Sequence, residues 1–156
     1  MNNFAITGAD KACINLPSSA DAMIFEGTMT NCNTDGESWG GAIVNYPGST
    51  GGMLHVENVT IENAYVNLID TDLQHVTISN VSATITSGST QTGTVLTSDF
   101  GVASEVKMFN FDAPDYSSAS INALGVINMT EVDWGTADLV VAPGGSSSTA
   151  NGPSGD

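Results

Sequence analysis

Val59-Thr60-Ile61-Glu62-Asn63 belongs to a phrase that recurs along the chain, and this recurrence decides the expected fold. A later copy is Val76-Thr77-Ile78-Ser79-Asn80, and an earlier one is Gly27-Thr28-Met29-Thr30-Asn31. In each copy, apolar and polar residues alternate with the period of two that indicates a β-strand. Weaker copies occupy residues 4–8, 109–113 and 130–134. The central residues of the copies are Ile6, Met29, Ile61, Ile78, Phe111 and Val132.

A second short segment follows each copy of the phrase. These segments occupy residues 13–16, 43–46, 65–68, 94–97, 120–123 and 139–142. The two sets of segments recur in the same order, with unequal spacing between copies. This pattern fits a β-solenoid, because extra residues can form loops at the corners while the strands stay stacked. Strands of adjacent rungs would lie about 4.8 Å apart. In such a stack, Asn31, Asn63 and Asn80 are expected to form a ladder of side-chain amides.

The sequence therefore predicts an all-β protein, a right-handed parallel β-helix (β-solenoid) of about six rungs with corner-loop insertions. We expect the β-helix domain over residues 1–143 and a Gly/Ser-rich tail or linker over residues 144–156. The insertions at residues 32–41 and 83–93 would leave from the same corner of the stack, whereas residues 47–52 would leave from another.

The charge of the chain restricts its partners. Its formal net charge is −15, and its basic residues besides two histidines are Lys11 and Lys107. Such a surface repels phosphate backbones, so we expect no nucleic-acid partner. No stretch approaches the roughly 20 apolar residues of a membrane helix, so we expect no membrane insertion. An acidic surface of this kind suits an extracellular, cell-surface or virion-surface setting, which is the predicted localisation.

Two cysteines, Cys13 and Cys32, lie on neighbouring predicted rungs near the same corner. Adjacent rungs could bring their Cα atoms to the separation of about 4.4–6.8 Å that a disulfide requires. Two buried free thiols are the alternative interpretation.

The repeat pattern over roughly residues 3–142 resembles the pectin-lyase-like superfamily of right-handed β-helices. The lyases of that superfamily use arginine or lysine to remove a proton from uronate, but this chain has no arginine. Asn33-Thr34-Asp35-Gly36 is similar to the first motif of the polygalacturonases, which implies an acidic catalytic role for Asp35. The Asp-Asp, Gly-His-Gly and Arg-Ile-Lys motifs of those enzymes are missing from the sequence. We therefore assign no catalytic residue and expect a protein that is not an enzyme.

Two sets of residues are candidate calcium ligands. Asn31, Asn33, Asp35 and Glu37 resemble the first half of an EF-hand loop, with oxygen ligands at alternate positions around Gly36. Asn replaces the usual first Asp, and Ala42 stands where the bidentate Glu would be, so a capped turn without metal is the alternative. The second set ends the second segments of two adjacent rungs and comprises Asp70, Asp72 and Asp99. Stacked carboxylates repel, so they would either bind a cation or lie solvated and screened.

Other surface residues are candidates for recognition or modification. Trp39 lies in a predicted corner and could stack on a sugar ring, although aromatic residues that cover a core are commoner. Asn58 and Asn128 begin glycosylation sequons that are expected to face outward. His55 and His75 precede the first strands of adjacent rungs without a third ligand at fixed spacing, which argues against zinc.

Taken together, these features predict a non-catalytic extracellular or surface module with a structural or adhesive role. Uncapped solenoid ends expose strand edges, so we expect part of a larger protein or a self-assembling particle, with copies of itself or other surface proteins as partners. Calcium is the one expected cofactor. The alternative is a carbohydrate-active β-helix, either a polysaccharide hydrolase or lyase fragment or a module like a phage tailspike, with polysaccharide as its partner.

Overall fold

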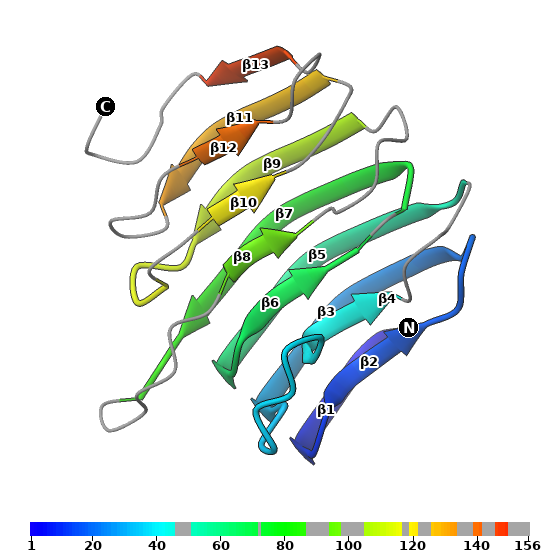
Figure 1. The fold of residues 1–156 in the computed structure, drawn as a ribbon, viewed down its shortest axis with the longest axis vertical. Helices are drawn as coiled ribbons and strands as arrows, with labels where there is room; N and C mark the ends of the chain where they lie inside the picture. The colour runs from blue at the N-terminus through cyan, green and yellow to red at the C-terminus, as the bar shows by residue number, and fades with distance from the viewer. Residues whose placement is uncertain are drawn as a thin grey trace.

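Long and short strands alternate along the chain and stack into parallel sheets (Figure 1). The computed structural model describes residues 1–45, 51–71, 73–86, 94–97, 105–116, 119–121, 126–133, 139–141 and 146–149. Every strand pair in these ranges is parallel, which confirms the predicted all-β class. Within the same ranges there is no helix that could cross a membrane.

The odd-numbered strands form one seven-stranded sheet in the order β1-β3-β5-β7-β9-β11-β13. Because each strand pairs with the odd-numbered strands before and after it, the sheet grows steadily from one end of the chain to the other. The strands are β1 (Asn2–Ala9), β3 (Asp21–Cys32), β5 (Met53–Ala64), β7 (His75–Thr84), β9 (Glu105–Asp112), β11 (Val126–Asp133) and β13 (Ser146–Thr149). β13 lies within the segment for which we expected a tail, and it pairs with β11.

The even-numbered strands are shorter and lie across one side of the long sheet (Figure 1). Four of them form a sheet in the order β2-β4-β6-β8, and β10 pairs with β12. Their bounds are β2 (Ala12–Leu16), β4 (Gly41–Asn45), β6 (Asn67–Asp70), β8 (Thr94–Thr97), β10 (Ala119–Ile121) and β12 (Leu139–Val141). The chain thus passes from one sheet to the other and back at each step.

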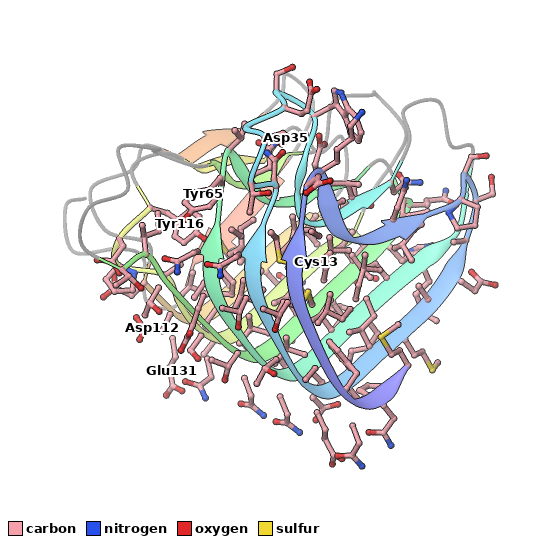
Figure 2. The ribbon with its side chains drawn as sticks, turned by 90° about the horizontal axis from the view of Figure 1, so that it is seen from below. Cys13, Asp35, Tyr65, Asp112, Tyr116 and Glu131 are labelled. Atoms are coloured by element: carbon pink, nitrogen blue, oxygen red, sulfur yellow. A yellow bond between two sulfur atoms is a disulfide. The ribbon has the colours of Figure 1, made fainter. Side chains whose placement is uncertain are left out.

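A column of residues in the left-handed conformation crosses the long sheet. One such residue in each of six successive long strands has a φ between 48° and 55°, and the residues on either side of it pair in register with a neighbouring strand. We call this set the bend column; it comprises Asn3, Glu26, Asn58, Asn80, Asn110 and Glu131. Asn tolerates this conformation better than most residues, which explains why it fills most of the positions. Figure 2 shows the long strands curving around the interior of the molecule.

Side-chain amides connect neighbouring strands at the bend column. Asn80 Nδ2 donates to Asn58 Oδ1 over 3.0 Å, and Asn110 Nδ2 donates to Asn80 Oδ1 over 3.0 Å. A separate bond runs from Asn63 Nδ2 to Asn31 Oδ1 over 3.1 Å. The predicted ladder of Asn31, Asn63 and Asn80 is therefore wrong in its third member.

The reason for this error lies in the repeat itself. Two asparagines in the left-handed conformation occur in β5, Asn58 at the bend column and Asn63 nearer the end of the strand. The phrase at 76–80 resembles the one at 59–63, but Val76 pairs with Leu54 and Ile78 pairs with Val56. The predicted ladder thus aligned Asn80, at the bend of β7, with Asn63, at the second bend of β5, instead of with Asn58 at the first.

The core lies between the two sheets and consists of stacked aliphatic columns. In the long sheet, Ile24, Val56, Ile78 and Met108 pair in succession, and each is almost completely buried. In the short sheet, Ile14, Ile43 and Ile69 pair in the same way. Full burial of one such side chain contributes about 1.5–3 kcal/mol relative to exposure. These columns explain why a chain with so few charged pairs holds its strands in one register.

Candidate functional site

The outer face of the long sheet gathers most of the cationic groups of this acidic chain. Both histidines and one of the two lysines lie there, on β5, β7 and β9. His55 pairs in register with Thr77, which pairs with Lys107, so these side chains lie in one row across three strands. His75 pairs with Glu105 in the adjacent row. The face is therefore a mixed-charge surface within a strongly negative molecule.

Ion pairs connect these groups at half-exposed positions. Lys107 Nζ lies 2.8 Å from Glu105 Oε1, and His75 Nδ1 lies 3.8 Å from Glu105 Oε2. The hydrogen bond from Lys107 lowers the pKa of the Glu105 carboxyl below its usual value, and the charges of Lys107 and His75 act in the same direction. His55 Nε2 forms a third pair with Glu57 Oε2 at 3.5 Å. Such exposed pairs add little stability, but they fix the positions of the side chains.

A shallow hollow of about 300 Å³ opens on the same side of the molecule. We call it the Phe25 hollow; its lining comprises Asn2, Phe25, Glu26, Glu57 and Asn58, from β1, β3 and β5. The lining combines one aromatic ring with two carboxylates and two amides. His55 meets the Phe25 ring edge to face at 5.2 Å between ring centroids, and this contact holds the ring in place.

Apolar side chains adjoin the hollow on β3. Met23 is about half exposed, and its carbonyl accepts a hydrogen bond from the N-terminal ammonium of Met1 over 2.6 Å. The Phe25 amide donates in turn to the Met1 carbonyl over 2.9 Å. The N-terminal residue is thus tied to β3, beside the hollow. The sequence analysis did not predict this site. The residue that could have pointed to it is Glu26, which directly precedes the copy of the phrase that begins at Gly27.

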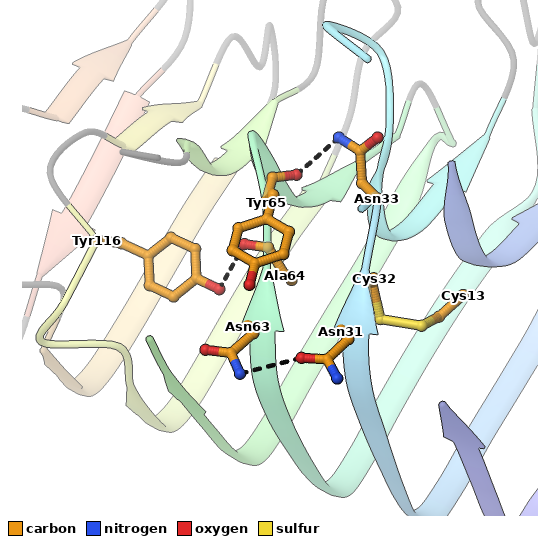
Figure 3. Close-up of a disulfide and its surroundings, with 8 residues drawn as sticks. All are labelled: Cys13, Asn31, Cys32, Asn33, Asn63, Ala64, Tyr65 and Tyr116. Carbon is orange, nitrogen blue, oxygen red and sulfur yellow. Dashed lines mark hydrogen bonds between the residues drawn. A yellow bond between two sulfur atoms is a disulfide. The ribbon is translucent and has the colours of Figure 1, made fainter. Parts of the chain in front are cut away.

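A disulfide fixes the corner at the other end of β3 (Figure 3). It joins Cys13 of β2 to Cys32 of β3, with the Cα atoms 5.2 Å apart. Cys32 is completely buried within the core. The bond therefore ties the short sheet to the long sheet near the N-terminal end of the stack.

Asn33 organises the loop that follows the disulfide. Its side chain is completely buried, and its Nδ2 donates to the carbonyls of Glu37 and Tyr65, both over 2.9 Å. Its Oδ1 accepts a hydrogen bond from the Glu37 amide over 2.9 Å. Figure 3 shows the contact with Tyr65 on the neighbouring strand connection. One amide thus closes the loop and attaches it to the next rung.

The four residues of the expected EF-hand-like loop have different surroundings. The Oδ1 atoms of Asn31 and Asn33 accept hydrogen bonds from Asn63 and from the Glu37 amide. Asp35 is exposed at the loop tip and Glu37 is half-buried. In the part of the chain that the structure describes, no group of three or more His, Cys, Asp or Glu side chains could hold a metal. Calcium binding stays a prediction, with the Asp35 and Glu37 carboxylates as its remaining support.

Among the other predicted residues that the structure describes, one lines the Phe25 hollow. Asp70 ends β6, where it pairs with Val44 and Thr97, whereas Asp72 and Asp99 lie outside the described residues. Trp39 is 38 % exposed, with the Lys11 ammonium 5.4 Å from the centre of its ring. Of the glycosylation candidates, Asn128 is half-buried on β11. The other, Asn58, is exposed, lines the hollow and accepts the Asn80 amide.

A buried tyrosine connects two rungs at the disulfide side of the molecule, and sequence analysis did not single it out. Tyr116 is 1 % exposed, and its hydroxyl donates to the Ala64 carbonyl over 3.1 Å (Figure 3). Burial raises the pKa of Tyr116 above its usual value, so the hydroxyl stays protonated and keeps its donor role. The Tyr116 hydrogen bond therefore connects β5 to the turn after β9.

Comparison with known proteins adds no relative. No protein-family model matches the chain, and neither a curated protein nor a solved structure matches it.

Proposed function

We propose that the chain is a non-catalytic structural module of an extracellular or surface assembly, folded as a right-handed parallel β-helix of about six rungs. In this proposal the module works as a stiff rod that lengthens when copies stack end to end. The observation that carries it is the parallel stacking of successive rungs, because an added rung could pair with the outer edges of β1 and β2 as β3 and β4 pair with their inner edges.

Core side chains at this edge are incompletely covered. Ile6 pairs with Met29, which pairs with Ile61; Met29 and Ile61 are completely buried, whereas Ile6 is only half-buried. Phe4 and Leu16 are likewise only partly buried. A further strand beside β1 would cover these side chains, as the neighbouring strands cover Met29 and Ile61. Removal of apolar surface from water would drive such an association.

The backbone of β1 bends at the same positions as the backbone of β3. Asn3 and Gly8 in β1 have φ values of 51° and 74°, like the corresponding Glu26 and Asn31 in β3. A strand of the same shape could therefore add to β1 in the register that β1 and β3 already share. The occupant we propose is the last rung of a second copy, which would continue both sheets in the same parallel sense.

Sedimentation velocity tests this proposal. Because each copy carries a net charge of −15, repulsion opposes stacking, and we expect association to increase from low to high salt. Ile6→Lys places a charge at the edge of the core and should keep the protein monomeric. Thr7→Lys is the matched control, because Thr7 is exposed on the same strand and the change in charge is identical.

Two results would contradict the proposal. One is a wild-type chain that stays monodisperse and monomeric at high concentration and high salt. The other is equal association of the Ile6→Lys and Thr7→Lys variants, because it would show that the uncovered core at β1 is not the contact.

A further inference from the structure

We propose that the Phe25 hollow binds a small organic cation with an apolar body, such as an alkylammonium ion or the side chain of lysine or arginine. This site is separate from the stacking edge of the proposed function, because it lies on the outer face of β1, β3 and β5.

The charge of the lining selects a cation. Glu26 and Glu57 both line the hollow, and among the described residues the only ion pair that either forms is the one between Glu57 and His55 at 3.5 Å. The two carboxylates of the lining repel anions and attract cations. Charge-assisted hydrogen bonds from an ammonium or guanidinium group to carboxylates are among the stronger polar contacts in proteins.

The aromatic ring gives the hollow a place for the apolar body of the ligand. Phe25 is half-buried, and the edge-to-face contact with His55 holds its ring. A cation within about 6 Å of a ring centroid is attracted by the negative face of the ring. Asn2 and Asn58 add amide groups that can accept hydrogen bonds from the same ligand.

Glu26 is one of two glutamates in the bend column, the other being Glu131 near the opposite end. The bend column holds Asn at four of its six positions, and three of these asparagines form the amide ladder. Glu26 lies next to Asn58 in that column, so an asparagine there could extend the ladder by one strand. The side chain found instead contributes a carboxylate to the hollow at the expense of backbone preference.

Titrations followed by NMR on the full chain at pH 8 would test the site. The probes are n-butylammonium chloride, Nα-acetyl-lysine methylamide, a tri-lysine peptide and, as neutral comparison, maltose. We expect saturable shifts of the Phe25 and Glu57 amide signals with the cations, weakened by salt, and none with maltose. Stronger binding of n-butylammonium than of the peptide assigns the site to free amines, and the reverse order assigns it to a polypeptide partner.

Glu26→Asn is the decisive variant, because asparagine suits the left-handed conformation and the variant should fold at least as well as the wild type. We expect it to weaken cation binding about tenfold, the loss typical of one hydrogen bond to a charged group. Glu131→Asn is the matched control: Glu131 has the same conformation, at the other end of the bend column, and its replacement should leave binding unchanged. Equal binding by Glu26→Asn, equal losses in both variants, or no binding of any cation would overturn the proposal.

Discussion

Asn80 lies at the centre of the amide ladder, and its replacement separates two contributions to the stability of the stack. The Asn80 side chain donates to Asn58 and accepts from Asn110, both over 3.0 Å, and its φ is 52°. We predict that Asn80→Ala destabilises the fold by about 2 kcal/mol. About half of this comes from two exposed hydrogen bonds at about 0.5 kcal/mol each. The other half is the cost of the left-handed conformation for alanine, about 1 kcal/mol.

Asn80→Gly isolates the second contribution. Glycine loses the same two hydrogen bonds but adopts positive φ without steric cost, so this variant should be about 1 kcal/mol more stable than Asn80→Ala. Urea unfolding followed by circular dichroism at 25 °C measures the difference as a shift of the midpoint at constant slope. Ser79→Ala is the control, because Ser79 is the half-exposed neighbour outside the ladder; it should change stability by less than about 0.5 kcal/mol. A glycine variant no more stable than the alanine variant would refute the role assigned to the backbone conformation.

Three further predictions concern other parts of the molecule. Replacing both Cys13 and Cys32 by alanine should lower the free energy of unfolding by at least about 3 kcal/mol, the chain-entropy value for a separation of 19 residues, because the change at Cys32 also leaves a buried cavity. Urea unfolding of the variant and of the oxidised wild type measures the difference, and a loss under about 1 kcal/mol would contradict the expectation. Lys107→Gln should raise the pKa of Glu105 toward its ordinary value in an NMR titration. Because the folded-state pKa of Glu105 is lowered, its contribution to stability is present above the unfolded-state pKa and is lost as the pH falls through the folded-state value, so the variant should lose less stability on acidification than the wild type. Millimolar calcium in place of EDTA should raise the melting temperature by several degrees, and Asp35→Asn should abolish that shift; identical melting curves with calcium and with EDTA would exclude the predicted site.

Much of the strand content was predictable because period-two patterning is a local signal. Residues 94–97 were expected as a strand and form β8, and residues 139–142 contain β12. The long strands extend further than the phrase does: β5 spans Met53–Ala64 although only residues 59–63 carry the repeat. The extra residues lie before the bend column. The alternation of apolar and polar residues shifts by one position at the left-handed residue and then continues. A search for strict alternation therefore ends at that residue.

The candidate site was less predictable, because its parts come from three strands that are distant in sequence. Phe25 and Glu57 pair across β3 and β5, and Asn2 pairs with Phe25 from β1, but none of these residues belongs to a recognisable local motif. In contrast, Asn33 was noticed as a possible metal ligand because of its local spacing. The structure shows its amide in hydrogen bonds to Glu37 and Tyr65, and the second of these partners could not be identified without the stacking register.

The sequence by itself determined the class of structure and the character of the surface. Alternating apolar residues require two-sided strands, and the repeated phrase requires that they stack in order. The charge of −15 makes the surface strongly acidic and predicts repulsion of anionic backbones. Only the tertiary structure decided which asparagine faces which, because two similar bends occur in β5 and a shift from one to the other leaves the local pattern almost unchanged. The register is chosen instead by the core columns, in which Ile78 packs between Val56 and Met108. That choice places Glu26 and Glu57 around Phe25 and so creates the hollow on the outer face.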